Sequence, residues 1–439
     1  MLCRKIPNWI YTKKYRFKPS VTHEIVLAGL SCHTIFMATP DRKWTLRTCC
    51  SVHALHDGMV DMLYALLPLL REALGLSYTE TALIRSVHQF ADAAFQIPIA
   101  IAAEKAGERN LLILGTLIVG GAFLALGFAD GYSAILAFVF VAGFGAAFCH
   151  PLSSSIVSQA FSGAPLRTAL GIYNAAGDVG KFIFLGSTIL ATASLGYSWQ
   201  VPVLGFGVAA IIIAMAALIL LNYANAGGPP GASDKSEQAE NAGDWGIKHR
   251  KGFYALSVIA VLDNATRVGF LIFVSFLMIE KGVATEWAAS AVVVTVFGGM
   301  CGKYAVGLIA ARIGVARSIL LTEIATAVLI VIVVAVPSLF AFLLLPFVGV
   351  FLNGTSSAIY GTVPELIEGK KHSRAYGLIY TTVSGAGLVA PLIYGQLADF
   401  SGVVTTMIVM AAGVLLTIPL CGILARSLRD ATGPAIRTN

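Results

Sequence analysis

Apolar segments of about twenty residues or more recur along the chain from residue 48 onward, and most of the polar turns between them are short. A helix needs ~20 mostly apolar residues to cross a bilayer, so each segment is long enough to do so. The pattern predicts twelve membrane-spanning helices, at residues 48–70, 79–103, 110–129, 132–160, 168–194, 199–221, 253–279, 287–310, 315–335, 338–362, 375–397 and 402–425.

The pattern also predicts how the chain is divided. Residues 222–251 are rich in Gly, Pro, Ser and charge and cannot bury a core, so we expect a flexible linker there. The linker separates two six-helix bundles, at 48–221 and 252–426, and residues 427–439 follow as a short tail. Residues 1–47 are basic, and we expect either a disordered tail or sequence that lies upstream of the true start.

Composition restricts the class of protein. The 439 residues are 57% hydrophobic and 12% charged, with a mean hydropathy of +0.80, whereas a soluble domain has ~25% charged residues. The chain is therefore expected to be an all-α membrane protein. The seven cysteines show no metal-ligand spacing, and we expect free thiols.

The distribution of Lys and Arg predicts the orientation. If the termini and the linker are cytoplasmic, nearly all loop Lys and Arg lie inside, and only Arg71 and Lys281 lie in outer loops. We therefore expect a multi-pass protein of the cell (inner) membrane with both termini cytoplasmic. The same bias accounts for the net charge of +7, so nucleic-acid binding is not needed to explain it.

The two halves of the chain repeat. Asp263 stands 206 residues after Asp57, and Gly314 stands 207 residues after Gly107. The second span of the first half is followed by AIAAEKAGER, and the second span of the second half leads into GLIAARIGVAR, so a similar basic turn recurs. Parallel six-helix repeats around a site at the membrane midplane are typical of transporters.

With these turns, residues 48–426 resemble the major facilitator superfamily. The family motif between spans two and three is G-x-L-a-D-r-x-G-r-k, and here Glu104 stands at the acidic position. The resemblance implies two pseudo-symmetric six-helix bundles and a gating role for the matching positions, which are Glu104, Lys105, Gly107, Arg109, Gly307, Arg312 and Gly314. The alternative for these charges is a solvated turn.

A narrower resemblance concerns the fosmidomycin-resistance type of drug exporter. It rests on the pair His56-Asp57 in span one and on PLSSSIVSQAF after His150 in span four. Gly180 is followed by Lys181, whereas drug antiporters of the superfamily carry Gly-Pro on this span. The narrower resemblance implies efflux of a drug or another small organic solute.

Ionisable residues within the spans are the candidates for coupling chemistry, because such groups are costly in a bilayer and usually mark an ion or substrate path. Asp57, Asp61 and His53 share one helical stripe on span one, and His56 lies beside it. Burial disfavours the charged form of a carboxyl group, so Asp57 and Asp61 are the expected proton sites, and His53 or His56 could pass the proton. A purely structural pairing of His53 with Asp57 is the alternative.

Further polar residues within the spans are expected to line a central cavity. They are His88, Gln89, Asp92, His150, Asn174, Asp178, Lys181, Asp263, Asn264, Arg267, Lys303 and Asn353. We expect Asp178–Lys181 and Asp263–Arg267 to form structural ion pairs. Arg85, near the end of its span, is expected to extend outward to the membrane surface.

These observations predict a monomeric secondary transporter that moves a small organic solute, with proton-coupled efflux as the first interpretation. Proton-coupled uptake of an organic acid is the alternative, and a non-transporting receptor is a third class. No catalytic motif or metal-ligand set is specified by spacing, so we expect no enzyme activity, cofactor or metal. The expected partners are the solute, protons and the bilayer.

Overall fold

The computed structural model describes residues 40–161, 163–228, 247–366 and 372–432. Its first group of helices is α2 (Pro40–Leu74), α3 (Tyr78–Ala106), α4 (Glu108–Gly127), α5 (Tyr132–Ala146), α6 (Cys149–Ala160), α7 (Gly163–Ile189), a π-helical turn (Leu190–Ser194) and α8 (Gln200–Tyr223). Its second group is α9 (Arg250–Glu280), α10 (Thr285–Ala288), α11 (Ser290–Ile313), α12 (Val315–Ala335), α13 (Ser338–Thr362), a 3₁₀ turn (Val363–Leu366), α14 (His372–Ser401), α15 (Val403–Val414) and α16 (Thr417–Thr432).

Each predicted span coincides with one helix or with two consecutive helices. Eight helical segments of the described residues are long and apolar enough to cross a membrane. The helices α2, α3 and α7 are 35, 29 and 27 residues long and carry many of the predicted polar site residues. Helix α2 begins at Pro40, before the expected start at residue 48, whereas residues 1–39 of the expected tail and 229–246 of the linker lie outside the described residues.

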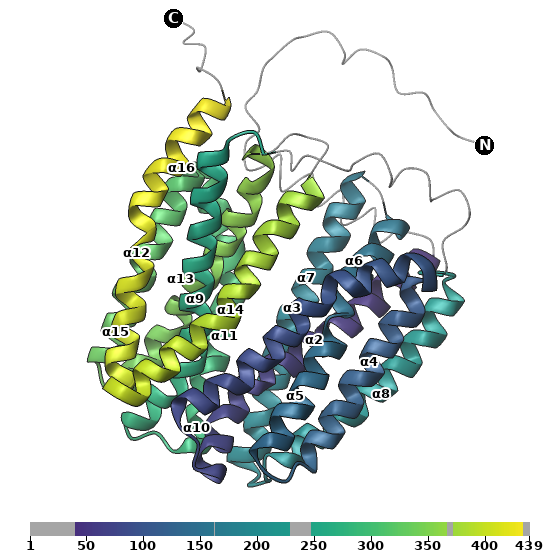
Figure 1. The fold of residues 1–439 in the computed structure, drawn as a ribbon, viewed down its shortest axis with the longest axis horizontal. Helices are drawn as coiled ribbons and strands as arrows, with labels where there is room; N and C mark the ends of the chain where they lie inside the picture. Colours follow the sequence, from purple (N-terminus) through teal and green to yellow (C-terminus); the bar gives the residue numbers. More distant parts are fainter. Residues whose placement is uncertain (1–39, 162, 229–246, 367–371, 433–439) are drawn as a thin grey trace, which may run out of the picture.

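The helices form two bundles that lie side by side, with α2–α8 on the right of Figure 1 and α9–α16 on the left. The end at which α8 stops and α9 starts is called the linker end below, and the opposite end is called the far end. The bundles contact each other through α3 with α14 and through α7 with α11. In Figure 1 the two groups of helices diverge toward the linker end.

Two glycines turn the chain at the linker end. Gly107 (φ 82°) joins α3 to α4, and Gly314 (φ 86°) joins α11 to α12. Positive φ is accessible to glycine at little cost. The predicted repeat of this turn is therefore present in the backbone of both bundles.

The fourth predicted span is interrupted between α5 and α6, just before His150 and Pro151, which is consistent with the proline. The five cysteines within the described residues, at 49, 50, 149, 301 and 421, are free thiols.

Candidate functional site

The site is built where α2 packs against α7, and glycines on α7 make the contact close. A Cβ atom on Gly177 would lie 2.6 Å from Cε1 of His53 and 2.7 Å from Oδ2 of Asp57. A Cβ atom on Gly180 would lie 2.0 Å from the carbonyl oxygen of Ala54. Only glycine permits this approach, which brings α7 directly against the polar stripe of α2.

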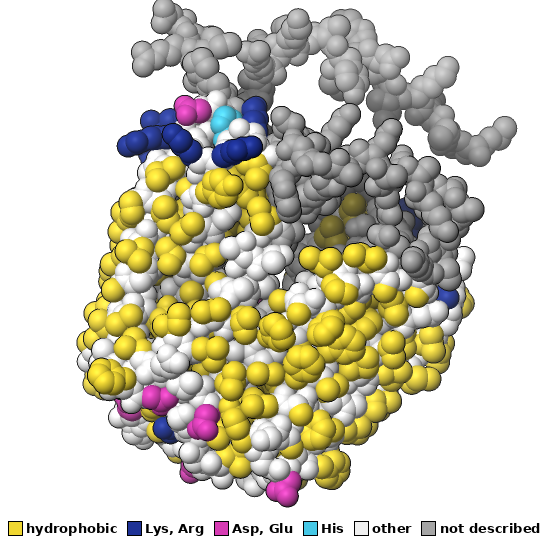
Figure 2. Space-filling view, viewed as in Figure 1, with side chains coloured by type: hydrophobic (Ala, Val, Ile, Leu, Met, Phe, Trp, Pro, Cys, Tyr) yellow, Lys and Arg dark blue, Asp and Glu magenta, His cyan; other side chains and the backbone are white. Residues whose placement is uncertain are grey.

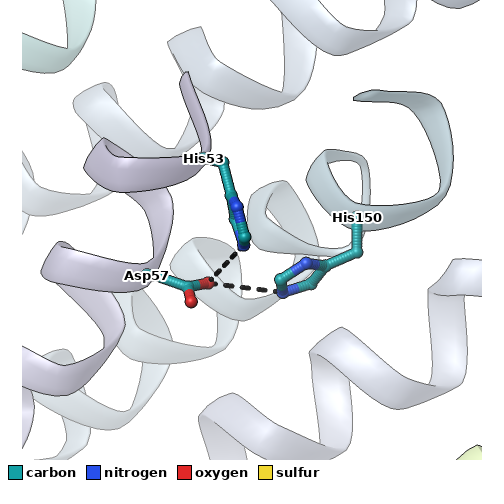
Figure 3. Close-up of side chains that lie close together, drawn as sticks. All are labelled: His53, Asp57 and His150. Atoms are coloured by element: carbon teal, nitrogen blue, oxygen red, sulfur yellow. Dashed lines mark ion pairs between the residues drawn. The ribbon is translucent and has the colours of Figure 1, made fainter. Parts of the chain in front are cut away.

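Asp57 is the centre of the resulting cluster. Its Oδ1 lies 3.4 Å from Nε2 of His53 on the same helix and 3.4 Å from Nε2 of His150 on α6, and Figure 3 shows both rings directed at this oxygen. Its Oδ2 lies 3.1 Å from Nζ of Lys181 on α7. The side chain of Asp57 is 13% exposed and that of His150 is 48% exposed, so the cluster is accessible through His150.

The hydrogen bonds of His53 indicate where a proton is held. Nδ1 of His53 lies 2.7 Å from the carbonyl oxygen of Tyr173, and the two rings stack 4.0 Å apart. A carbonyl oxygen only accepts, so Nδ1 must carry a hydrogen. A neutral His53 would then present the lone pair of Nε2 to an oxygen of Asp57. A second proton, on Nε2 or on the carboxyl group, removes this repulsion.

The same three residues have the composition of a metal site. One ligand atom from each of His53, Asp57 and His150 lies within 4.8 Å of the others. The ammonium group of Lys181, however, already neutralises the carboxylate of Asp57 and repels a second cation.

An ion pair between Asp178 and Lys303 joins the two bundles. Nζ of Lys303 on α11 donates to both carboxylate oxygens of Asp178 on α7, at 2.7 Å each. Asp178 also lies 3.5 Å from Lys181, as expected from their spacing in the sequence. Asp57, Lys181, Asp178 and Lys303 thus form a continuous row of alternating charges that runs from α2 through α7 into the second bundle.

The other predicted polar residues of the first bundle include one further candidate proton site, and several of the others contact neighbouring residues within the bundle. Asp61 has no ion pair among the described residues, and it stays a candidate proton site. His56 points away from the cluster, with Nε2 3.0 Å from Oγ1 of Thr116 on α4. On α3, His88 is buried, and Asp92 accepts a hydrogen bond of 3.1 Å from Gln96. Asn174 on α7 is exposed.

The second bundle differs from the expected pairing. Arg267 donates to Oδ1 of Asn264, and no ion pair joins it to Asp263 in the described part of the chain. The amide nitrogen of Asn264 donates to the carbonyl of Val383 at 2.8 Å, which ties α9 to α14. With the amide nitrogen of Asn264 bound to α14, its amide oxygen is directed at Arg267, and Arg267 binds this oxygen in place of the Asp263 carboxylate.

Two further predicted residues lie where helices meet. A Cβ atom on Gly387 of α14 would lie 3.1 Å from Nδ2 of Asn264 and 3.7 Å from Cγ of Gln89, so Gln89 reaches across to the second bundle. Asn353 donates to the carbonyl of Gly349 at 3.4 Å and packs against Gly299 of α11.

The expected outward extension of Arg85 is wrong. Its residue is 6% exposed, and its guanidinium carbon lies 5.2 Å from the centre of the Tyr64 ring. The aromatic face of Tyr64 and the carboxyl groups of Asp61 on α2 and Asp92 on α3 stabilise the cation inside the bundle.

The predicted gating turn is partly described. The backbone N–H of Arg109 donates to the carbonyl of Gly227 at 2.8 Å, which joins the turn to the chain that follows α8. The side chains of Glu104 and Lys105 lie outside the described residues. Glu108, which the sequence reasoning missed, accepts hydrogen bonds from Ser155 and, at 2.7 and 2.9 Å, from Gln159 of α6. In the second bundle, Gly307 and Arg312 are exposed.

The far end is joined by another residue that the sequence reasoning missed. Asp399 of α14 accepts hydrogen bonds from the backbone N–H groups of Tyr78 and Thr79, at 2.7 and 2.9 Å. It also accepts one from the Thr79 hydroxyl at 2.6 Å. The first turn of α3 has unpaired N–H groups, which an acidic side chain satisfies well. One carboxylate therefore holds the two bundles together at the far end.

Comparison with known proteins agrees with this architecture. The family model described as the Major Facilitator Superfamily matches residues 49–322, which is more than half of the chain. The protein therefore belongs to the major facilitator superfamily. It is a membrane transporter by family, with the all-α fold of two helical bundles.

Two curated relatives extend over most of the chain. The "Uncharacterized MFS-type transporter YfnC" of Bacillus subtilis (strain 168) is 25% identical over 384 residues, which cover 85% of this chain and 90% of that protein. The "Probable sulfoacetate transporter SauU" of Cupriavidus necator is 23% identical over 364 residues, which cover 76% and 82%.

Solved structures share the fold. A bacterial homolog of the human lysosomal transporter Spinster aligns with a TM-score of 0.76 at 15% identity, over 91% of this chain and 100% of that one. The nucleoside transporter NupG aligns with a TM-score of 0.70 at 12% identity, over 88% and 100%.

Proposed function

We propose that the protein is a proton-coupled secondary transporter of a small organic solute, and that Asp57 is the coupling residue. The observation that carries this proposal is the cluster of His53, Asp57, His150 and Lys181, which needs a proton to relieve the contact between His53 and Asp57. Transport driven by a proton gradient requires a group that binds a proton on one side and releases it on the other. The row of charges from Asp57 to Lys303 links that group to the contact between the bundles.

The orientation belongs to the same proposal. We place the linker end in the cytoplasm, because Lys and Arg gather there and Asp and Glu gather at the far end, as Figure 2 shows. At the far end Asp399 joins α14 to α3, which supports access to the site from the linker end. A cysteine at Ser236 should then react only with thiol reagents that enter the cell, and a cysteine at Asp130 should react with impermeant ones. The opposite labelling pattern would invert the topology.

The direction we propose is efflux, in line with the resemblance to exporters described above. Uptake of an organic anion is the second candidate, and two observations favour it. A relative is named as a probable sulfoacetate transporter, and Lys181 and Lys303 place two ammonium groups beside the site. Flux of a labelled sulfoacetate probe into right-side-out and inverted vesicles, each with an imposed pH gradient, would distinguish the directions.

The coupling role is tested with Asp57→Asn in proteoliposomes. The substitution fixes a neutral amide in place of the carboxyl group, so gradient-driven transport should fall to background while exchange of substrate for substrate survives. Asp263→Asn is the comparison variant, because it removes a buried carboxyl group from the equivalent helix of the other bundle, and we expect it to reduce transport less than Asp57→Asn does. Full pH-dependent transport by Asp57→Asn would overturn the assignment, and Asp61 would be the next carboxylate to examine.

A further inference from the structure

An open pocket of about 620 Å³ lies at the linker end of the second bundle, away from the site between the bundles. Its walls come from the ends of α11, α12, α13 and α16. Most of the lining is apolar or small, including Ile313, Val315, Ala358 and Leu428. Its volume is within the ~300–1,000 Å³ typical of small-molecule sites.

The polar part of the pocket is a basic rim. Arg317 and Arg429 are lining residues, with Glu365 as the acidic one. Seven exposed basic residues lie at this end of the second bundle within the described residues, namely Lys248, Arg250, Lys251, Arg312, Arg317, Arg426 and Arg429. Figure 2 shows Lys and Arg side chains gathered above a surface of mixed apolar and uncharged groups. Only Glu365 and Asp430 are exposed acidic residues of the described segments there.

The turn at the linker end of the first bundle makes polar contacts among the described residues. There Glu108 is hydrogen-bonded to Ser155 and Gln159, and the chain after α8 covers Arg109 and Ile156 through Gly227. Val315 stands 207 residues after Glu108 and has no polar group with which to make these bonds. The side-chain hydrogen bonds that Glu108 makes in the first bundle are therefore not repeated at Val315 in the second.

We propose that this pocket binds an anionic phospholipid of the adjoining leaflet, with an acyl chain against the apolar wall and the phosphate at Arg317. Lipid is the occupant that fits both parts, because the lining combines an apolar wall with the side chains of Arg317 and Arg429. Basic pockets between transmembrane helices bind anionic headgroups in this way. A free anion would use the arginines but would leave the apolar wall exposed to water.

The experiment uses the purified full chain in detergent, with binding followed by the shift in Tm and by native mass spectrometry. The probes are micelles doped with phosphatidylglycerol, micelles doped with phosphatidylcholine, and inorganic phosphate. We expect phosphatidylglycerol to bind and to raise Tm more than phosphatidylcholine does, and inorganic phosphate to have no effect. Neither readout depends on transport, so failure here is distinct from failure of the proposed function.

Three variants locate the binding. Arg317→Gln should weaken phosphatidylglycerol binding about fivefold, which is the effect of one basic residue at a membrane surface. Gly361→Leu should weaken binding as well. Gly361 lines the pocket and has open space around it, so a leucine side chain there would occupy the cavity without changing its charge. Arg426→Gln is the matched control, since it removes an exposed arginine at the same end that does not line the pocket.

Several outcomes would overturn the proposal. Equal loss with Arg426→Gln would indicate diffuse attraction, and equal stabilisation by inorganic phosphate would indicate a free-anion site. Equal binding of phosphatidylcholine would exclude headgroup recognition. Phosphatidylglycerol binding that appears only after deletion of residues 433–439 would indicate that this segment, and not lipid, occupies the pocket of the full chain.

Discussion

Asp178 lies between two ammonium groups, and this position determines what its loss would do. Lys303 binds both of its oxygens at 2.7 Å, and Lys181 lies 3.5 Å away on the same helix. Removal of the carboxylate leaves two cations beside each other, whereas removal of Lys303 leaves Asp178 still paired with Lys181. The two single substitutions are therefore not equivalent.

We predict that Asp178→Asn destabilises the protein more than Lys303→Gln does. The expected loss for Asp178→Asn is about 1–3 kcal/mol, which is below the ~3–5 kcal/mol of a fully buried pair because the Lys303 side chain is 37% exposed. The measurement is Tm in detergent for both singles and for the double variant. The double variant should recover part of the loss, since it removes one of the two facing cations; equal effects of both singles would contradict the arrangement.

At this scale the sequence predicts local relations and misses long-range ones. Helical spacing places His53 with Asp57 and Asp178 with Lys181, and both relations are present. It cannot place His150 beside Asp57 or Lys303 beside Asp178, because these partners are about a hundred residues apart and meet only after the bundles pack. The expected pair of Asp263 with Arg267 is local, but Arg267 donates to Asn264 instead, and the carbonyl that orients Asn264 comes from α14, which is distant in sequence.

Helix α7 is the element that assembles the site. It packs against α2 through Gly177 and Gly180, and it carries Asp178 and Lys181 toward opposite neighbours. The sequence alone does not distinguish these glycines from Gly171 and Gly186 of the same helix, whose Cβ positions have no atom within 4 Å.

We predict that Gly177→Ala displaces the cluster. The added methyl group would lie 2.6–2.8 Å from atoms of His53 and Asp57, and overpacking of this kind costs ~1–3 kcal/mol. Tm should fall, and gradient-driven transport should fall further than Tm alone accounts for, because the two helices that hold the proposed proton site must separate. Gly171→Ala on the same helix is the control and should leave both unchanged. If Gly177→Ala behaves like Gly171→Ala, the two helices are not held in contact at this point.

The whole molecule is two bundles joined at the middle by Asp178–Lys303 and at the far end by Asp399. Periodicity, the linker and the repeated turns predict the bundles well, because apolar length and glycine turns are local properties. The contact at Asp399 is not predictable in this way. It joins residues 320 positions apart and uses backbone N–H groups, which every helix offers at its start.

The far-end contact gives the last prediction. If the protein alternates access, opening of the far end requires α3 to part from Asp399 of α14. We therefore expect a Thr79→Cys/Asp399→Cys double variant, made in a Cys301→Ser background to remove an exposed native thiol, to form a disulfide on oxidation, because the two native side chains approach to 2.6 Å. Transport should then drop to the level of protein-free liposomes and return on reduction.

Each single cysteine variant, oxidised in the same way, is the control and should keep transporting. The physical reason is that a covalent bond at the far end holds the bundles in the closed arrangement, whereas the hydrogen bonds of Asp399 can exchange with water during each cycle. Cross-linked protein that still transports at the uncross-linked rate would show that the far end does not open. The route of the solute would then have to leave the space between α3 and α14 closed throughout the cycle.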